Sequence, residues 1–237
     1  MKKALGQTQR KVAIFDIDGT IFRSSLLIEA TEALIQKGLF PLEMKNVYKK
    51  AYKNWADRKD SYDRYIEAVV KAFEENIKGI NYGDFLKISK RIIDFYKNRV
   101  YRYTRDLVKE LKKKNYYILA ISNSPKALVD EFCKHFGFDK VYGRLLEINK
   151  KGKYTGKIMY VDLLNDKAKM LKRAVEKENL TLKDSVGVGD SESDIPFLKM
   201  VKRPICFNPN NKLYQRARQS GWEIIVERKD VIYRMNS

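Results

Sequence analysis

The sequence predicts an α/β protein in which a doubly wound parallel sheet carries a helical insertion after its first strand. Short apolar runs recur along the 237-residue chain, and most of them are separated by helical patterns. Strands that alternate with helices favour a parallel sheet. The alternation is interrupted between about residues 24 and 100, where apolar residues follow helical spacing.

The predicted strands are short apolar runs that end in polar residues or glycine, as buried strands do. A different segment, 141–160, reads as a β-hairpin around Lys150–Gly152. The predicted strands are KVAIF at 11–15, YYILAIS at 116–122, DSVGVGDS at 184–191, PICFN at 204–208 and WEIIV at 222–226.

Helical patterns lie between these strands. The clearest covers 124–137, because Ser124 can cap a helix, Pro125 suits its first position and Gly137 suits its end. A second helix is predicted for 165–180, where the apolar residues fall on one face.

Four helices are predicted within the insertion, each with one apolar stripe. The aromatic residues of these stripes could stack on nucleic-acid bases, but packing between helices explains the same spacing, and we favour it. The helices run from Ser24–Ser25 to about Lys37, from near Pro41 to Trp55, from Tyr62 to Phe73 and from Phe85 to Tyr96. We therefore expect a four-helix cap at 23–100, and a core built from 1–22 and 101–237.

The net charge of +19 is the unusual feature of the composition. It could attract nucleic acid, acidic membranes or phosphorylated substrates. Basic residues are spread along the chain, however, and KKK at 112–114 is their one notable cluster. We interpret the charge as a solvated surface and do not expect nucleic acid as a partner.

The chain is expected to be cytoplasmic. It has no apolar run near the roughly 18 residues that a membrane span needs. The apolar stretch near the start is broken at Asp16 and Asp18, so no signal peptide is expected. Cys133 and Cys206 do not form a disulfide framework, which fits a reducing compartment. The sequence gives no indication of an oligomeric state.

Two carboxylates follow the first strand in the segment IFDIDGT. At the strand end Asp16 would project from the carboxyl edge of the sheet, where open α/β folds bind ligands. Asp18 could turn toward the same space, because Gly19 permits a tight turn. Two surface aspartates in a turn would give the same pattern, since Asp and Gly are common turn residues.

Three further segments bring polar groups to the same edge. Ser122 and Asn123 lie at a helix start, where a hydroxyl and free N–H groups can hold phosphate. Lys167 opens a helix against its dipole, which an anion-binding role would explain, although chance is a competitor in a lysine-rich chain. Asp190 and Asp194, in VGVGDSESDIP, follow a strand, and their oxygens suit Mg²⁺.

The order DIDGT, strand–Ser, Lys and GDSESD resembles the four motifs of haloacid dehalogenase (HAD) superfamily phosphatases, from residue 12 to about 226. The insertion lies where this family has its type 1 cap. Four helices with a later hairpin look like the phosphoserine-phosphatase-like branch (subfamily IB). The resemblance implies a Rossmann-like HAD core and Mg²⁺-dependent hydrolysis of a small phosphorylated metabolite.

The resemblance also assigns catalytic and metal-binding roles by position. Asp16 would attack phosphorus and form an aspartyl-phosphate. Asp18 would protonate the leaving oxygen and then activate water. Mg²⁺ would bind the Asp16 carboxylate, the Asp18 backbone carbonyl and Asp190, with Asp194 in support. An acid at the position of Asp18 marks the phosphatases and phosphomutases of the family.

The same resemblance implies which groups bind the substrate. Ser122, the N–H of Asn123 and the catalytic Lys167 would hold the phosphoryl oxygens. Thr20, which ends the first motif, and Arg23, which could bind a second anionic group, are further candidates. A solvated loop charge is the alternative for Arg23.

One position departs from the phosphoserine enzymes. Those enzymes use a Glu shortly after the first motif to meet the substrate ammonium, whereas this chain has Ser25 there and Glu29 one turn later. Phosphoserine itself is therefore not the expected substrate. Arg58 and Arg64, in the insertion, are further candidates for substrate contact.

Two other functions remain open at this stage. A phosphotransferase would use the same intermediate and pass the phosphoryl group to an alcohol. A basic binding protein on an inactive HAD scaffold would be expected to carry a damaged motif, and all four motifs are intact.

Overall fold

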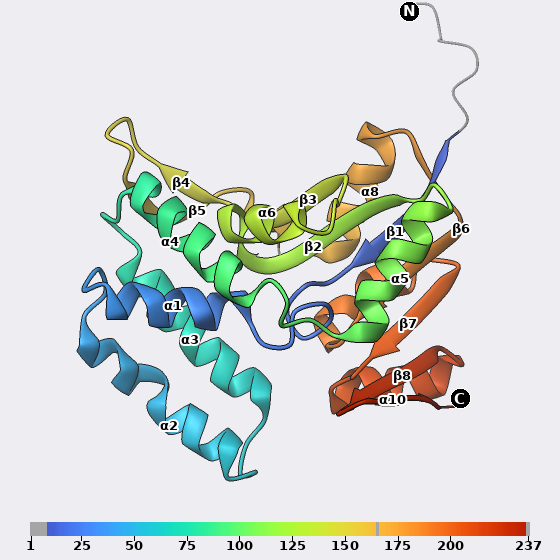
Figure 1. The fold of residues 1–237 in the computed structure, drawn as a ribbon, viewed down its shortest axis with the longest axis horizontal. Coiled ribbons are helices and arrows are strands. Elements are labelled where there is room, and N and C mark those ends of the chain that lie inside the picture. The colour runs from blue at the N-terminus through green and yellow to red at the C-terminus, as the bar shows by residue number, and fades with distance from the viewer. Residues whose placement is uncertain (1–8, 165, 236–237) are drawn as a thin grey trace, which may run out of the picture.

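The fold is centred on a seven-stranded sheet with the order β3-β2-β1-β6-β7-β8-β9 (Figure 1). The structure is a computed structural model and describes residues 9–164 and 166–235. Neighbouring strands are parallel except for β8 and β9, which are antiparallel. The strands are β1 (Arg10–Phe15), β2 (Tyr117–Pro125), β3 (Lys140–Arg144), β6 (Leu180–Gly189), β7 (Arg203–Phe207), β8 (Glu223–Arg228) and β9 (Val231–Met235).

The sheet is buried on both faces, as the apolar run of β1 predicts. Ala13 and Phe15 pack into one hydrophobic cluster, and Val12 and Ile14 pack into another. Alternate side chains of a strand point to opposite faces, so each cluster is one layer of the core. Helices α5 (Arg102–Lys113) and α6 (Lys126–Lys134) cover the first face, and α8 (Lys167–Lys177), α9 (Ile195–Leu198) and α10 (Asn211–Ser220) cover the second. The predicted doubly wound α/β class is therefore confirmed.

Four α-helices lie between residues 24 and 100, as predicted, and α5 then leads back to β2 of the sheet. We call them the cap helices, and Figure 1 shows α1 to α3 set apart from the sheet. Ser61 and Asn81 begin the third and fourth helices by accepting backbone N–H bonds. The cap helices are α1 (Leu26–Gln36), α2 (Lys45–Ala56), α3 (Tyr62–Asn76) and α4 (Tyr82–Tyr96), and a short 3₁₀ helix, η1 (Leu42–Met44), precedes α2.

The cap helices share a hydrophobic core with the sheet. Phe22, just before α1, packs edge-to-face on Phe132 of α6, with ring centres 5.6 Å apart. A small hairpin of β4 (Leu146–Ile148) and β5 (Tyr154–Ile158) also contacts the cap, because the Tyr154 N–H donates to Ile80 O at 2.9 Å.

The structure corrects several predicted boundaries. The hairpin exists, but 141–144 belong to β3 at the edge of the main sheet. β2 continues to Pro125, so α6 begins at Lys126 and Ser124 does not cap it.

The helix predicted at 165–180 is shorter in the structure. It begins at Lys167, and Leu180 already belongs to β6; residue 165 lies outside the described residues. β9 was not predicted. A short helix, α7 (Val161–Leu164), lies before α8. Within the described ranges, none of the helices has the length and apolar character to cross a membrane.

Candidate active site

The residues of the four motifs meet at the carboxyl ends of β1, β2 and β6. Asp16 directly follows β1, and its N–H donates to Val188 O at 3.0 Å, which fixes the end of β1 against β6. Asp190 directly follows β6, and Ser122 lies near the end of β2. Parallel strands place these ends on one edge of the sheet, so the prediction from strand ends gives the observed proximity.

Lys167 is buried between two carboxylates. Its Nζ donates to Asp16 Oδ1 at 2.7 Å and to Asp194 Oδ1 at 2.5 Å, and its side chain is 4% exposed. Burial alone would lower the pKa of Lys167, but the charges of Asp16 and Asp194 outweigh it and raise that pKa. Burial raises the pKa of Asp16 to about 8, although the Lys167 ammonium opposes this rise.

Two glycines allow the carboxylates to approach. Gly19 has φ +80, and a Cβ there would lie 2.1 Å from Asp190 Oδ2. A Cβ on Gly189 would lie 2.5 Å from Asp194 Oδ2. Both distances are far below van der Waals contact, so the aspartates occupy space that only glycine leaves open.

Asp194 is held from several sides. Its Oδ2 accepts the N–H groups of Asp190 at 2.9 Å and Ser191 at 3.1 Å, while Oδ1 accepts from Lys167. The side chain is fully buried. Both carboxylate oxygens of Asp194 are therefore engaged by donors within the protein.

Asp16, Asp190 and Asp194 form a group that fits a hard cation. One carboxylate oxygen from each lies within 4.8 Å of the other two. Burial raises the pKa of Asp190, and the negative charge of Asp16 adds to the rise. Carboxylate oxygens are the donors that Mg²⁺ prefers, and a cation here would offset the crowded negative charge.

Asp18 faces the end of β2. Its Oδ2 accepts the hydroxyls of Ser122 and Ser124, each at 2.8 Å. Its Oδ1 accepts the Leu26 N–H at 2.5 Å, at the first turn of α1. The Ser122 hydroxyl, expected to bind phosphate, is thus directed at Asp18. Ser124 is a site residue that sequence reasoning assigned to a helix cap.

The other predicted contacts lie in different places. The Thr20 hydroxyl is buried and donates to Asp190 Oδ1 at 3.4 Å, so Thr20 orients Asp190 and does not line the cavity described below. Arg23 is exposed, and its guanidinium carbon lies 5.6 Å from the ring centre of Tyr101, also outside the cavity lining. Asn123 does line the cavity.

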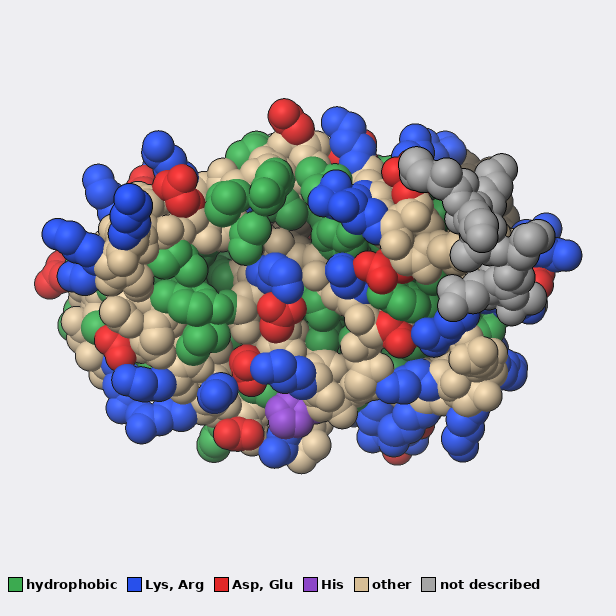
Figure 2. Space-filling view, turned by 90° about the horizontal axis from the view of Figure 1, so that it is seen from above, with side chains coloured by type: hydrophobic (Ala, Val, Ile, Leu, Met, Phe, Trp, Pro, Cys, Tyr) green, Lys and Arg blue, Asp and Glu red, His purple; other side chains and the backbone are tan. Residues whose placement is uncertain are grey.

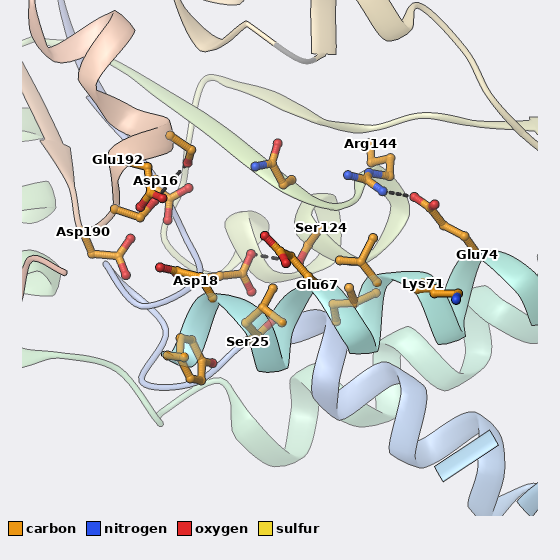
Figure 3. A pocket seen from close by; sticks show the side chains of 18 of the residues that line it. Asp16, Asp18, Ser25, Glu67, Lys71, Glu74, Ser124, Arg144, Asp190 and Glu192 are labelled. Atoms are coloured by element: carbon orange, nitrogen blue, oxygen red, sulfur yellow. Dashed lines mark hydrogen bonds and ion pairs between the residues drawn. The ribbon is translucent and has the colours of Figure 1, made fainter. Parts of the chain in front are cut away.

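A cavity of about 710 Å³ separates the strand ends from α3 (Figure 3). Burial raises the pKa of Tyr62, and the charges of Asp18 and Asp190 add to this rise. The sequence analysis interpreted the spacing of α3 as helix packing and missed this lining. The residues of α3 on the cavity wall are Tyr62, Asp63, Ile66, Glu67, Val70, Lys71, Glu74 and Glu75.

Comparisons with known proteins agree with this geometry. The sequence model of a family described as "haloacid dehalogenase-like hydrolase" matches residues 13–199. A histidinol-phosphatase from Neisseria meningitidis is 23% identical over 91% of this chain and 98% of its own. A phosphoserine phosphatase from Methanocaldococcus jannaschii is 25% identical over 95% and 96% of the two chains.

Solved structures show the same fold. A protein of unknown function from Bordetella pertussis Tohama I aligns with a TM-score of 0.70 and 18% identity, over 92% of this chain and 98% of its own. A phospho-aspartyl intermediate analogue of phosphoserine phosphatase aligns with a TM-score of 0.61 and 22% identity, over 94% and 96% of the two chains. From its sheet, its motif geometry and the match over 13–199, this chain belongs to the haloacid dehalogenase-like hydrolase family.

Proposed function

We propose that this protein is a Mg²⁺-dependent phosphatase that hydrolyses a small organic phosphate monoester through an aspartyl-phosphate on Asp16. The observation that carries the proposal is the group formed by buried Asp16, Asp194 and Lys167 with half-buried Asp190 at the end of a cavity. Carboxylates alone would repel a phosphate dianion. A lysine and a cation site beside them reverse the local field and favour phosphoryl transfer.

Asp16 is the proposed nucleophile. One of its oxygens, Oδ1, is engaged by Lys167, and Oδ2 is the one that attacks phosphorus as the ester oxygen leaves. Asp18 gives a proton to that leaving oxygen and afterwards takes one from the attacking water. The bonds from Ser122, Ser124 and the Leu26 N–H hold Asp18 in a single orientation for both transfers.

Asp16 and Asp190, with the backbone carbonyl of Asp18, are the groups that would hold Mg²⁺, and Asp194 would support them. A bound Mg²⁺ would supply charge neutralisation for the transferring phosphoryl group. Lys167 supplies a second positive charge beside Asp16, and Asn123 lies on the cavity wall, where its N–H is proposed to bind a phosphoryl oxygen.

The cap is proposed to comprise residues 23–100 and to cover the substrate during the reaction. The position of α3 across the cavity supports this role. The names of the relatives, phosphoserine phosphatase and histidinol-phosphatase, support a small phosphorylated metabolite as substrate. The two cysteines, Cys133 and Cys206, are free and buried, which agrees with the proposed cytoplasmic location.

The proposal is tested with p-nitrophenyl phosphate. Turnover should require Mg²⁺, stop on chelation and fall by about 1000-fold or more in Asp16→Asn. Circular dichroism and thermal unfolding of the variant should match the unsubstituted protein. Activity that survives chelation or the substitution would refute the mechanism. Adding candidate alcohols and looking for phosphorylated products separates a phosphatase from a phosphotransferase.

A further inference from the structure

The catalytic cavity has a charge opposite to that of the whole molecule. The chain carries a net charge of +19, and Figure 2 shows Lys and Arg side chains spread over the visible face. The cavity, in contrast, is lined by eight acidic and three basic side chains. In so basic a chain, a cavity dominated by carboxylates favours a ligand that carries positive charge in addition to its phosphate.

The three basic side chains that line the cavity already have carboxylate partners. Lys167 lies between Asp16 and Asp194. Arg144 pairs with Glu74 at the end of the cavity away from Asp16 (Figure 3). The remaining pair, Lys71 and Glu75 on α3, is separated by 3.9 Å. Among the described lining residues, Lys167 and Arg144 are therefore engaged by carboxylates, and Lys71, whose side chain is 69% exposed, mainly faces solvent.

Four acidic side chains of α3 line the cavity, two in the first half of the helix and two near its end. Asp63 and Glu67 are one helical turn apart and both line the cavity. Burial raises the pKa of Asp63, and the charges of Glu192 and Glu67 add to this rise. Like charges at this spacing destabilise a helix. Asp63 accepts a bond from Asn210, and Glu67 has a mostly exposed partner in Arg64, so neither carboxylate is neutralised by a buried cation.

A second, independent feature points to a polar ligand group in the same cavity. Ser25 is 5% exposed and lines the cavity. It occupies the N-cap position of α1, yet its hydroxyl does not cap the helix. Among the described residues, this hydroxyl has no hydrogen-bond partner. A hydroxyl that opens onto a cavity without a protein partner is satisfied by water or by a ligand. The Leu26 N–H, one residue on, contacts Asp18, which places Ser25 beside the catalytic carboxylate.

Apolar side chains line the same cavity. Ile66 and Val70 of α3 and Leu27 of α1 line the cavity. Ile66 and Val70 are four residues apart and therefore lie on the same face of α3 as the acidic pair. The carbon chain of a ligand held by the acidic pair would contact these apolar side chains.

We propose that the substrate is the phosphate monoester of an amino alcohol that has a positively charged nitrogen and no second anionic group. The charged nitrogen binds between Asp63 and Glu67. The Ser25 hydroxyl forms a hydrogen bond with the alcohol portion of the ester, and Leu27 and Ile66 contact the carbon chain of that portion. This assignment rests on the proposed phosphatase function, and it names the substrate class of that site.

The test compares pairs of substrates that differ in charge. Aminobutyl phosphate and pentyl phosphate are similar in length, and O-phosphoserine adds a carboxylate to an amine. For the unsubstituted protein, kcat/KM should be at least about tenfold higher for aminobutyl phosphate than for pentyl phosphate, and higher than for O-phosphoserine. The preference should fall as salt is added, because charges that face solvent are screened.

The ratio of kcat/KM for aminobutyl phosphate to kcat/KM for pentyl phosphate is then measured in variants. Asp63→Asn combined with Glu67→Gln should reduce the preference for the amine at least about tenfold, with thermal unfolding used to show that the double variant is folded. Glu43→Gln is the matched control, because Glu43 is an exposed cap residue outside this cavity, and it should leave the ratio unchanged.

The outcomes separate the two proposals. Equal kcat/KM for the amine and its neutral counterpart, or a preference that survives in the double variant, overturns the assignment of substrate class while phosphatase activity stands. A higher kcat/KM for O-phosphoserine overturns it as well. Absence of turnover of all these esters and of p-nitrophenyl phosphate overturns the phosphatase itself.

Discussion

Lys167 and Asp16 form a buried ion pair, with Nζ 2.7 Å from Oδ1, at the end of a parallel strand. The same ammonium also contacts Asp194, so one cation compensates two carboxylates that burial would otherwise destabilise. The helix that carries Lys167 begins with this residue, and Asp166 caps it by accepting the N–H groups of Ala168 and Lys169. The cap offsets a lysine that opposes the helix dipole.

Removing this cation should destabilise the fold. Lys167→Met leaves Asp16 and Asp194 without their partner, and we expect a loss of about 3–5 kcal/mol in the free energy of unfolding without Mg²⁺. Adding Mg²⁺ should recover part of the loss, because it supplies positive charge to the same carboxylates. Denaturant unfolding measures both effects. Lys169→Met, on an exposed position of the same helix, should change stability by under about 0.5 kcal/mol. Equal stability of the two variants would contradict the role given to Lys167.

Gly19 should be essential because of its neighbour as well as its backbone angle. Gly19→Ala would place a Cβ 2.1 Å from Asp190 Oδ2 and displace Asp190. Displacement by about 1 Å lowers rates by about 100-fold, so kcat should fall by at least this factor. Gly38→Ala is the matched control, since Gly38 also has a positive φ, of +67, but no atom lies within 4 Å of its added Cβ. The control should lose stability and keep its kcat; a similar loss of kcat in both variants would show that the backbone angle alone matters.

Magnesium affinity should rise with pH. Burial raises the pKa of Asp16 to about 8 and also raises that of its neighbour Asp190, so the metal-free folded site holds a proton near neutral pH that the unfolded chain, with an ordinary Asp pKa of 3.8, releases. Stability without metal should therefore fall as pH rises through this window. Metal ligands must be deprotonated, so Mg²⁺ binding expels the proton below about pH 8. Calorimetry in buffers of different ionisation enthalpy should show proton release at pH 6.5 that disappears above pH 9. Binding without proton release at pH 6.5 would refute the raised pKa.

The sequence was sufficient to predict the position of those site residues that directly follow a strand. Asp16 and Asp190 follow apolar runs, and parallel pairing of those runs brings the two carboxylates together whatever the intervening chain does. That the four cap segments are helices was also predictable, because their apolar residues recur with the period of a helix.

Elements whose identity depends on distant partners could not be predicted in this way. The strand β3 has the local pattern of a hairpin arm, and only its pairing with β2 places it in the main sheet. Tyr62 and Glu67 face the cavity, yet their spacing along α3 is the same that packing against α2 requires. Ser124 has the sequence signature of a helix cap, but the carboxylate of Asp18 takes its hydroxyl.

The two serines on β2 should have separable effects. Both hydroxyls donate to Asp18 Oδ2 at 2.8 Å, so each alone can hold that carboxylate. If Ser122 also binds the phosphoryl group, Ser122→Ala should lower kcat by about 100-fold. Ser124→Ala should lower it by less than about tenfold, because Ser122 still orients Asp18. The double variant should lose more than the product of the single effects, since Asp18 then has no hydroxyl donor. Steady-state kinetics with p-nitrophenyl phosphate measures all three, and equal losses in the two single variants would restrict Ser122 to positioning Asp18.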